Sequence, residues 1–112
     1  MPYCGPSGST EICRWANVPP GDEVEVEFDM PEGCKARDVE VKIRNSHVLV
    51  KINGRTLVND ELLNRCDPDV SRWEIRGTRL VLVLQKEAGS TIPWPNVFVK
   101  DCKTHFDLTD VL

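Results

Sequence analysis

Apolar and polar residues alternate along several stretches of this chain, as they do in a β-strand that buries one face. Between residues 22 and 30, Val, Phe and Met alternate with Glu and Asp, which makes the exposed side of this predicted strand wholly acidic. We expect that side to be a solvated strand edge, and contact with a basic partner is the alternative. Residues 38–44 and 47–52 alternate in the same way, with charges of both signs on the polar side.

The most apolar run of the chain, residues 80–84, contains only Leu and Val. It is too short for a membrane helix and is typical of a strand buried on both faces. The stretch 72–76 precedes it, where Trp73 and Ile75 alternate with charged residues, and a short turn separates the two. We therefore predict a hairpin, with Trp73 as a core residue.

Short turns connect the remaining predicted strands. Asn53-Gly54 is a strong signal for a two-residue hairpin, because a type I′ turn needs positive φ at both positions. Further strands are expected at 12–16 and 55–58, whereas 59–68 fits either one helical turn or a short strand. With about seven short strands and almost no helix, the sequence predicts an all-β fold, a compact antiparallel β-sandwich.

Composition narrows the classes of function. The chain has 112 residues, which suits one domain, and its net charge of −4 argues against a generic nucleic-acid binder. It contains no apolar run long enough to cross a membrane, and its first ten residues lack the pattern of a signal peptide. We expect a cytoplasmic protein that binds neither nucleic acid nor membranes.

The five cysteines are widely and irregularly spaced, with no CxxC pair and only two histidines to assist them. Reduced thiols in a cytosolic protein are the favoured interpretation, and a disulfide framework, which would leave one thiol over, is the alternative. A zinc site is not expected for want of paired ligands. The chain also lacks a GxSxG nucleophile motif and a glycine-rich phosphate loop, so we predict no enzyme activity and no cofactor.

Three residues are candidates for contacts with a partner protein. Trp94 lies between two prolines, and we expect it either to close one end of the sandwich or to contact a partner. Lys86 follows the apolar run directly, where it is either a simple strand-end charge or part of the same contact. Trp15 lies in the first predicted strand.

The order of these features resembles the CS domain (CHORD-and-SGT domain), and PDVSRWEI together with LQK and a later Trp are its most specific segments here. This family includes the NudC nuclear-distribution proteins, the SGT proteins, and the small acidic co-chaperone of heat-shock protein 90, also called cytosolic prostaglandin E synthase. The resemblance implies a seven-stranded sandwich like that of small heat-shock proteins. The matching positions are Trp15, Val24, Val26, Gly33, Lys35, Asp38, Val39, Val41, Leu49, Val50, Gly54, Leu62, Pro68, Ser71, Trp73, Ile75, Leu84, Lys86 and Trp94.

Residues 1–11 contain Pro, Gly, Ser and Thr and lack periodicity, so we expect them to be a flexible arm. The resemblance implies that residues 12–98 are the CS domain and 99–112 a C-terminal extension, and it also implies a function. The chain would be a monomeric, non-enzymatic co-chaperone that binds heat-shock protein 90 and assists client proteins. A NudC-like chaperone or adaptor linked to dynein and nuclear movement is the alternative. The implied partner-binding residues are Lys86, Trp94, Trp15, Lys100 and Phe106.

Two positions depart from the co-chaperone pattern. Ala16 stands where that protein has the tyrosine needed for its proposed isomerase activity, so we do not expect that activity here. Asn96 replaces the arginine that follows its Trp-Pro pair.

Overall fold

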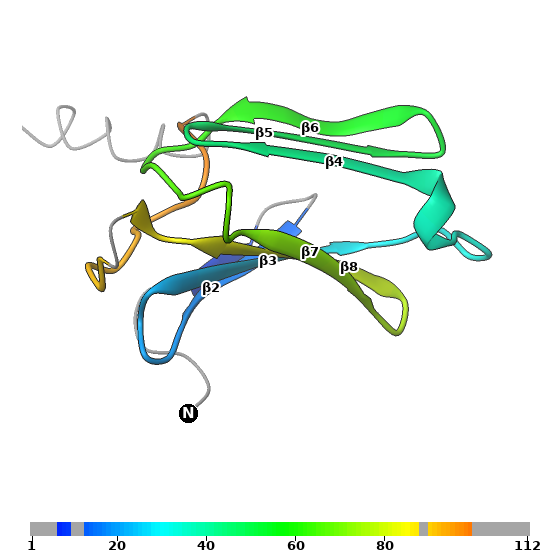
Figure 1. Cartoon of the computed structure of the whole chain (residues 1–112). Coiled ribbons are helices and arrows are strands. Elements are labelled where there is room, and N and C mark those ends of the chain that lie inside the picture. Colours follow the sequence, from blue (N-terminus) through cyan, green and yellow to red (C-terminus); the bar gives the residue numbers. More distant parts are fainter. Residues whose placement is uncertain (1–6, 10–12, 88–89, 100–112) are drawn as a thin grey trace, which may run out of the picture.

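Two antiparallel sheets stacked as two layers form the protein in the computed structural model, which describes residues 7–9, 13–87 and 90–99 (Figure 1). One sheet has the order β1 (Ser7–Ser9), β2 (Cys13–Val18), β3 (Glu23–Asp29), β8 (Arg79–Gln85), β7 (Arg72–Arg76). The other has the order β4 (Val39–Arg44), β5 (His47–Ile52), β6 (Arg55–Glu61), and a 3-10 turn, η1 (Ala36–Asp38), precedes β4. The predicted all-β sandwich is confirmed.

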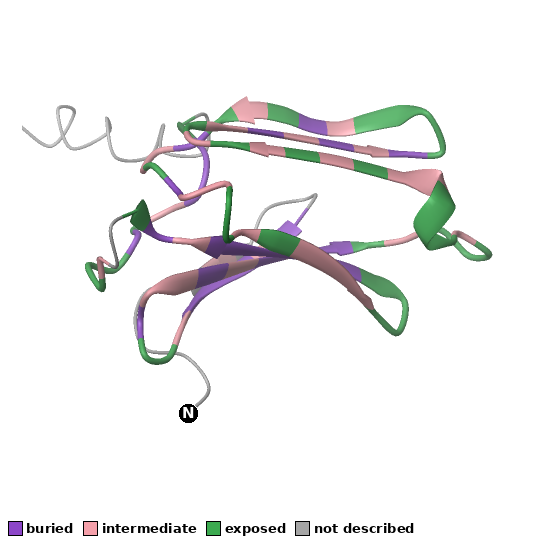
Figure 2. Cartoon of the chain, viewed as in Figure 1, coloured by how far each residue is buried: buried purple, intermediate pink, exposed green. Residues whose placement is uncertain are grey.

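The core lies between the layers, where the apolar residues of the alternating strands meet (Figure 2). Strand β8 is its centre, and residues 80–84 are all 0 % exposed, which confirms the prediction of a strand buried on both faces. Leu80, Leu82 and Leu84 join the core between the sheets. The buried side chains in this core cluster are Cys13, Trp15, Val24, Val26, Phe28, Val48, Val50, Ile52, Val58, Leu62, Cys66, Leu80, Leu82, Leu84, Trp94, Val97 and Phe98.

The acidic strand β3 is not at an edge, so the prediction of a solvated strand edge is wrong. It lies between β2 and β8, and its glutamates form ion pairs with arginines of β8 and of β7, the strand beyond it. Arg76 donates to both carboxylate oxygens of Glu25, each at 3.0 Å, and Arg79 donates to Glu27 at 3.1 Å. Alternation shows that one face of a strand is buried, but it does not reveal which strands lie beside it.

The turns follow the sequence closely. Asn53 and Gly54 both have positive φ, at 53° and 78°, as a type I′ hairpin requires. The ambiguous stretch 59–68 is extended: β6 continues to Glu61, and isolated bridges then join Leu62 to Phe98 and Cys66 to Lys86. The helical alternative for this stretch is therefore wrong.

Strand β1 is a feature that the sequence analysis did not predict, since it assigned residues 1–11 to a flexible arm. Ser7–Ser9 pairs with β2, and Gly8 is opposite Trp15. A Cβ atom on Gly8 would come within 2.9 Å of the Trp15 indole nitrogen, so the indole covers the glycine. The absence of a side chain at this position lets the tryptophan lie flat against the edge of the sheet.

Candidate functional site

Lys86 begins the segment that builds the candidate site. Its backbone N–H donates to the Asp22 carbonyl at 2.7 Å, which continues the β8 ladder by one residue. The residue is only 1 % exposed, and its Nζ donates to the carbonyl of Ile92 at 2.9 Å. The interpretation of Lys86 as a simple strand-end charge is therefore wrong: the ammonium group hydrogen-bonds to the segment that follows β8.

Trp94 is also buried, at 4 % exposed, and belongs to the core cluster. Of the two roles considered for it, the structure shows the closing of one end of the sandwich. Its N–H donates to Asn17 Oδ1 at 2.9 Å, and its carbonyl accepts from Asn17 Nδ2 at 3.0 Å. Because Pro93 and Pro95 have no N–H, Trp94 carries the one backbone donor of this tripeptide.

Asn17 is a residue that the sequence analysis missed. It is completely buried at the end of β2, and both groups of its amide are used to hold Trp94. An asparagine beside a predicted strand is a weak sequence signal, because nothing local shows that its partner is far along the chain. The predicted first strand also ended at residue 16, one residue short of it.

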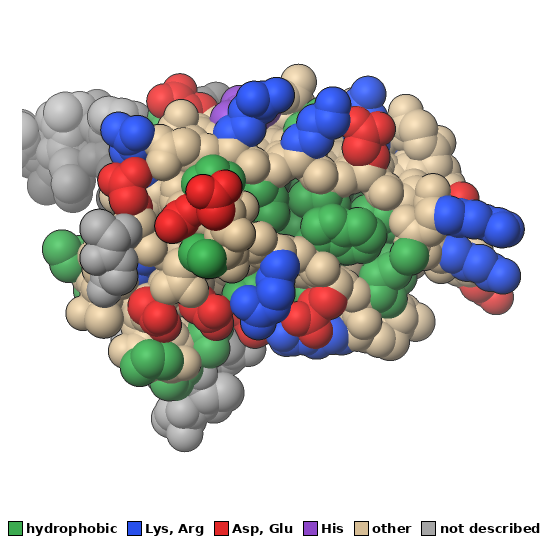
Figure 3. Space-filling view, in the orientation of Figure 1, with side chains coloured by type: hydrophobic (Ala, Val, Ile, Leu, Met, Phe, Trp, Pro, Cys, Tyr) green, Lys and Arg blue, Asp and Glu red, His purple; other side chains and the backbone are tan. Residues whose placement is uncertain are grey.

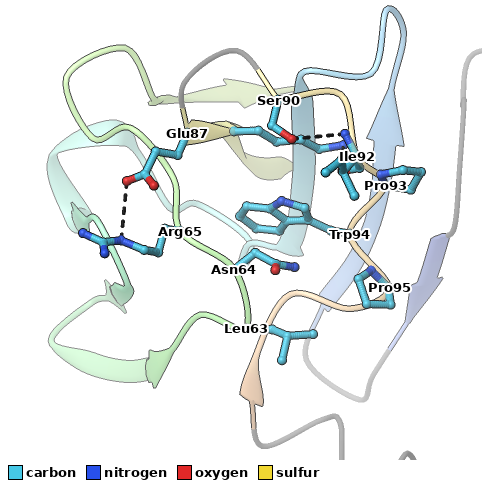
Figure 4. A pocket seen from close by; sticks show the side chains of 10 residues that line it. Leu63, Asn64, Arg65, Glu87, Ser90, Ile92, Pro93, Trp94 and Pro95 are labelled. Carbon is cyan, nitrogen blue, oxygen red and sulfur yellow. Dashed lines mark hydrogen bonds and ion pairs between the residues drawn. The ribbon is translucent and has the colours of Figure 1, made fainter.

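A pocket of about 480 Å³ lies beside Lys86 and Trp94 (Figure 4). Residues after β8 form one wall and residues after β6 form the other, and the Trp94 indole extends between the two. Ile92 on the rim is 73 % exposed. The lining residues are Leu63, Asn64, Arg65, Lys86, Glu87, Ser90, Ile92, Pro93, Trp94 and Pro95.

Hydrogen bonds fix the charged part of this rim. Arg65 Nε lies 3.4 Å from Glu87 Oε2 and donates to Asn45 Oδ1 at 2.6 Å. Asn45 Nδ2 in turn donates to Glu87 at 3.0 Å and to the Cys66 carbonyl at 2.9 Å. One side of the rim is therefore apolar and includes Ile92. The other side is polar and carries the ion pair between Arg65 and Glu87.

Cys66 lies beneath this network. Its thiol donates to the Arg44 carbonyl at 3.3 Å, and burial raises its pKa. A thiol that is buried and held protonated in this way is a poor nucleophile. Cys13, Cys34 and Cys66 belong to no disulfide in the described structure.

Only some of the five predicted partner-binding residues lie at the pocket. Lys86 and Trp94 come together at the pocket, whereas Trp15, 7 % exposed, packs in the core and does not line it. Lys100 and Phe106 lie outside the described residues. The structure therefore joins two of the five, and the contact of all five with a partner stays a prediction.

Within the described ranges, no three His, Cys, Asp or Glu residues are grouped so that they could hold a metal ion. The described residues also include no helix that is long and apolar enough to cross a membrane. The arrangement at the pocket offers hydrogen-bonding groups and apolar surface, which are the means of binding a protein surface.

The fold is a small antiparallel β-sandwich with a pocket at the end of β8. The profile of the CS domain matches residues 20–86, more than half of the chain, and the protein belongs to this family. The membership and the relatives below support a protein-interaction module of the kind associated with chaperones.

Curated relatives come from plants and animals. Protein BOBBER 2 of Arabidopsis thaliana is 35 % identical over 63 residues, covering 55 % of this chain and 22 % of its own. NudC domain-containing protein 2 of Homo sapiens is 24 % identical over 63 residues, covering 56 % and 40 %. Nuclear migration protein nudC of Drosophila melanogaster is 22 % identical over 102 residues, covering 90 % and 31 %. The chain thus spans less than half the length of these relatives.

Solved structures share the fold. The CS domain of the human KIAA1068 protein superposes with a TM-score of 0.66 at 22 % identity, covering 84 % of this chain and 77 % of that one. A nuclear movement protein from E. cuniculi GB-M1 gives a TM-score of 0.63 at 18 % identity, covering 78 % and 98 %. At these identities the likeness concerns the fold alone.

Proposed function

We propose that this chain is a non-enzymatic co-chaperone module that binds heat-shock protein 90 in the cytoplasm and assists the folding of client proteins. The observation that carries the proposal is the pocket at the end of β8, where Lys86 and Trp94 meet beneath the exposed side chain of Ile92. The resemblance to the co-chaperone branch of the CS family rests on Lys86, Trp94 and the C-terminal residues that follow them, which include Lys100 and Phe106.

Burial assigns different tasks to the residues of this surface. Lys86 and Trp94 shape it from beneath, because their side chains are almost entirely covered. Ile92 and Arg65 on the rim are exposed and make the contact itself. In this proposal Lys100 and Phe106 extend the contact along the chain, and Trp15 supports it from the core. An apolar anchor beside a charged rim is the usual anatomy of a protein interface.

Titration of fluorescently labelled chain with purified heat-shock protein 90, with and without an ATP analogue, tests the proposal. We expect binding at micromolar concentrations, and a loss of about tenfold or more in affinity for Ile92→Asp, because a buried anchor is worth on the order of 1–3 kcal/mol. Lys86→Ala and Trp94→Ala also weaken binding, but both change buried groups, so the rim variant is the cleaner test.

Val70→Asp is the matched control, because Val70 is an exposed apolar residue, 53 % accessible, that does not line the pocket. It introduces the same charge and should leave the affinity unchanged. The absence of binding at roughly tens of micromolar, or equal losses for Ile92→Asp and Val70→Asp, would contradict the proposal.

A NudC-like chaperone or adaptor linked to dynein and nuclear movement is the second candidate. The names of the relatives favour it, since two of them are NudC proteins. In this case the chain suppresses aggregation of a heated client protein in the absence of heat-shock protein 90. Suppression by the chain alone, with no affinity for the chaperone, would favour this candidate over the first.

A further inference from the structure

Strand β4 is an edge of the sandwich that is incompletely closed. It pairs with β5 on one side and has no strand partner on its other side within the described residues. Such an edge presents a row of unpaired N–H and C=O groups to any extended segment that comes beside it. Strand β7, at one edge of the opposite sheet, has the same open side.

The inward face of β4 is less buried than that of its neighbour. Val39, Val41 and Ile43 pack against the core but stay partly exposed. Their cross-strand partners on β5, which are Ile52, Val50 and Val48, are 0 to 3 % exposed. Residues directly opposite each other share a face of the sheet, so the inner face is well buried on β5 and only partly buried on the adjacent strand β4.

Strand β7 contributes the other side of this opening. Trp73 and Ile75 lie opposite Leu82 and Leu80, which places them on the inner face of their sheet, yet both are only partly buried. Figure 3 shows an apolar band on this side of the molecule, between the two layers. The prediction of Trp73 as a core residue is thus confirmed, since it packs against the core, although one part of it is accessible.

The outward side chains of β4 give this edge a charge. Lys42 and Arg44 are exposed, and Arg44 forms no ion pair with any residue that the structure describes. Lys42 is 3.6 Å from Glu40 on its own strand. Residues 35–55 as a whole carry six Lys and Arg against two Asp and Glu, in a chain whose net charge is −4.

We infer that β4 is the docking edge for an extended segment of a partner protein in which apolar residues alternate with acidic ones. The segment adds as a fourth strand beside β4, a known mode of peptide recognition. Its apolar side chains enter the band beside Val41, Ile43 and Trp73, and its carboxylates face Lys42 and Arg44.

The five-stranded sheet already contains the kind of contact that we infer for β4. Strand β3 carries the alternating sequence EVEVEFD, and its apolar residues are buried while its glutamates face arginines across the sheet. The Glu25–Arg76 pair, with both bonds at 3.0 Å, shows the geometry that such a contact reaches. This docking edge is separate from the pocket at Lys86, because no residue of β4 lines that pocket.

A labelled peptide of sequence EVEVEFD is the probe, and KVKVKFK, with the same apolar residues, is the charge-reversed control. We expect EVEVEFD to bind the full chain at least about tenfold more tightly, with the largest NMR shifts at β4. The double variant Lys42→Glu with Arg44→Glu should reverse this preference. The double variant Arg37→Glu with Arg55→Glu changes the net charge equally at exposed positions outside β4 and should retain it.

Backbone methylation separates strand addition from simple charge attraction. Two forms of EVEVEFD, each N-methylated on one alternate set of residues, keep all side chains but block opposite edges of the peptide. One form should lose binding about tenfold and the other should keep it. Equal behaviour of the two forms, an unchanged preference in the Lys42/Arg44 variant, or NMR shifts centred on Trp94 would overturn the inference. Loss of affinity for heat-shock protein 90 would leave it unaffected, because the surfaces are distinct.

Discussion

The central strand β8 and the edge strand β4 are both rich in apolar residues, yet they differ in what covers them. In β8, residues 80–84 are completely buried on both faces. In β4, the inward residues remain partly exposed and the outward ones are all charged. Hydrophobic stabilisation follows the apolar area removed from water. The buried strand β8 therefore contributes mainly to stability, whereas β4 keeps exposed apolar surface that a partner can cover.

The outer face of the five-stranded sheet explains why β8 is buried on both of its faces. Val81 and Val83 point away from the core and lie opposite Glu27 and Glu25 on β3. Charged side chains of β3, β7 and β8 join across this face in ion pairs, and their aliphatic stems can cover the valines. The charges of this face therefore pair with one another, whereas Arg44 on β4 forms no ion pair with any residue that the structure describes.

The largest expected effect comes from truncating the same residue type on the two sheets. Leu82→Ala opens a cavity at the centre of the core, and we expect it to lower the free energy of unfolding by about 3 kcal/mol. Leu49→Ala, on the outward face of β5 where the side chain is only partly buried, should cost less than about 1 kcal/mol. Urea denaturation of both variants measures the difference, and similar losses would contradict the contrast in burial between the centre of β8 and the outward face of the second sheet.

A matched pair of valines gives a smaller but sharper test. Val50 and Val41 are cross-strand partners on the same face, the first 0 % exposed and the second partly exposed. Val50→Ala should lower the free energy of unfolding by about 2 kcal/mol, and Val41→Ala by about 1 kcal/mol or less.

The same urea curves decide whether the β4 edge is open. If Val41→Ala costs as much as Val50→Ala, the inner face of β4 is as closed as that of β5, and the opening beside it does not exist. In the expected case, Val41→Ala weakens binding of the EVEVEFD peptide while the fold is retained, as far-ultraviolet circular dichroism should show.

Local patterns were sufficient to predict the strands, because period-two alternation and turn residues depend on neighbours in sequence. They placed β3, β4, β5 and the β7–β8 hairpin and identified the Asn53-Gly54 turn. Neighbouring strands could not be predicted in the same way. The edge assigned to β3 was wrong for this reason, since its arginine partners are about fifty residues further along the chain.

The candidate site was predicted only in part for the same reason. Lys86 and Trp94 could be selected as unusual residues, but their burial depends on contacts that no local pattern contains. Asn17 holds Trp94 across 77 residues of chain, and Lys86 donates its side-chain hydrogen bond to the carbonyl of Ile92, which lies beyond the end of β8. The exposed members of the site, Ile92 and Arg65, therefore became apparent only once the fold was known.

The smallest expected effect concerns the charged outer face of the five-stranded sheet and its dependence on pH. Arg14 donates to Asp29 at 3.0 Å, and this hydrogen bond, helped by the attraction of the two charges, lowers the pKa of the Asp29 carboxyl. A carboxyl whose pKa is lower in the folded state stabilises the fold above its ordinary pKa. It loses that contribution as the pH falls through the folded value.

Removing the partner tests this contribution directly. Between about pH 6 and about pH 2, the urea midpoint of the wild type should fall slightly further than that of Arg14→Ala, because the variant has no ion pair to lose. Both side chains are well exposed, at 43 % and 75 %, so the difference is small and shrinks in high salt. Arg37→Ala, which removes an exposed arginine without an ion pair in the described structure, should follow the wild type. If Arg14→Ala also follows it, the Arg14–Asp29 pair makes no measurable contribution to stability, which would contradict the prediction.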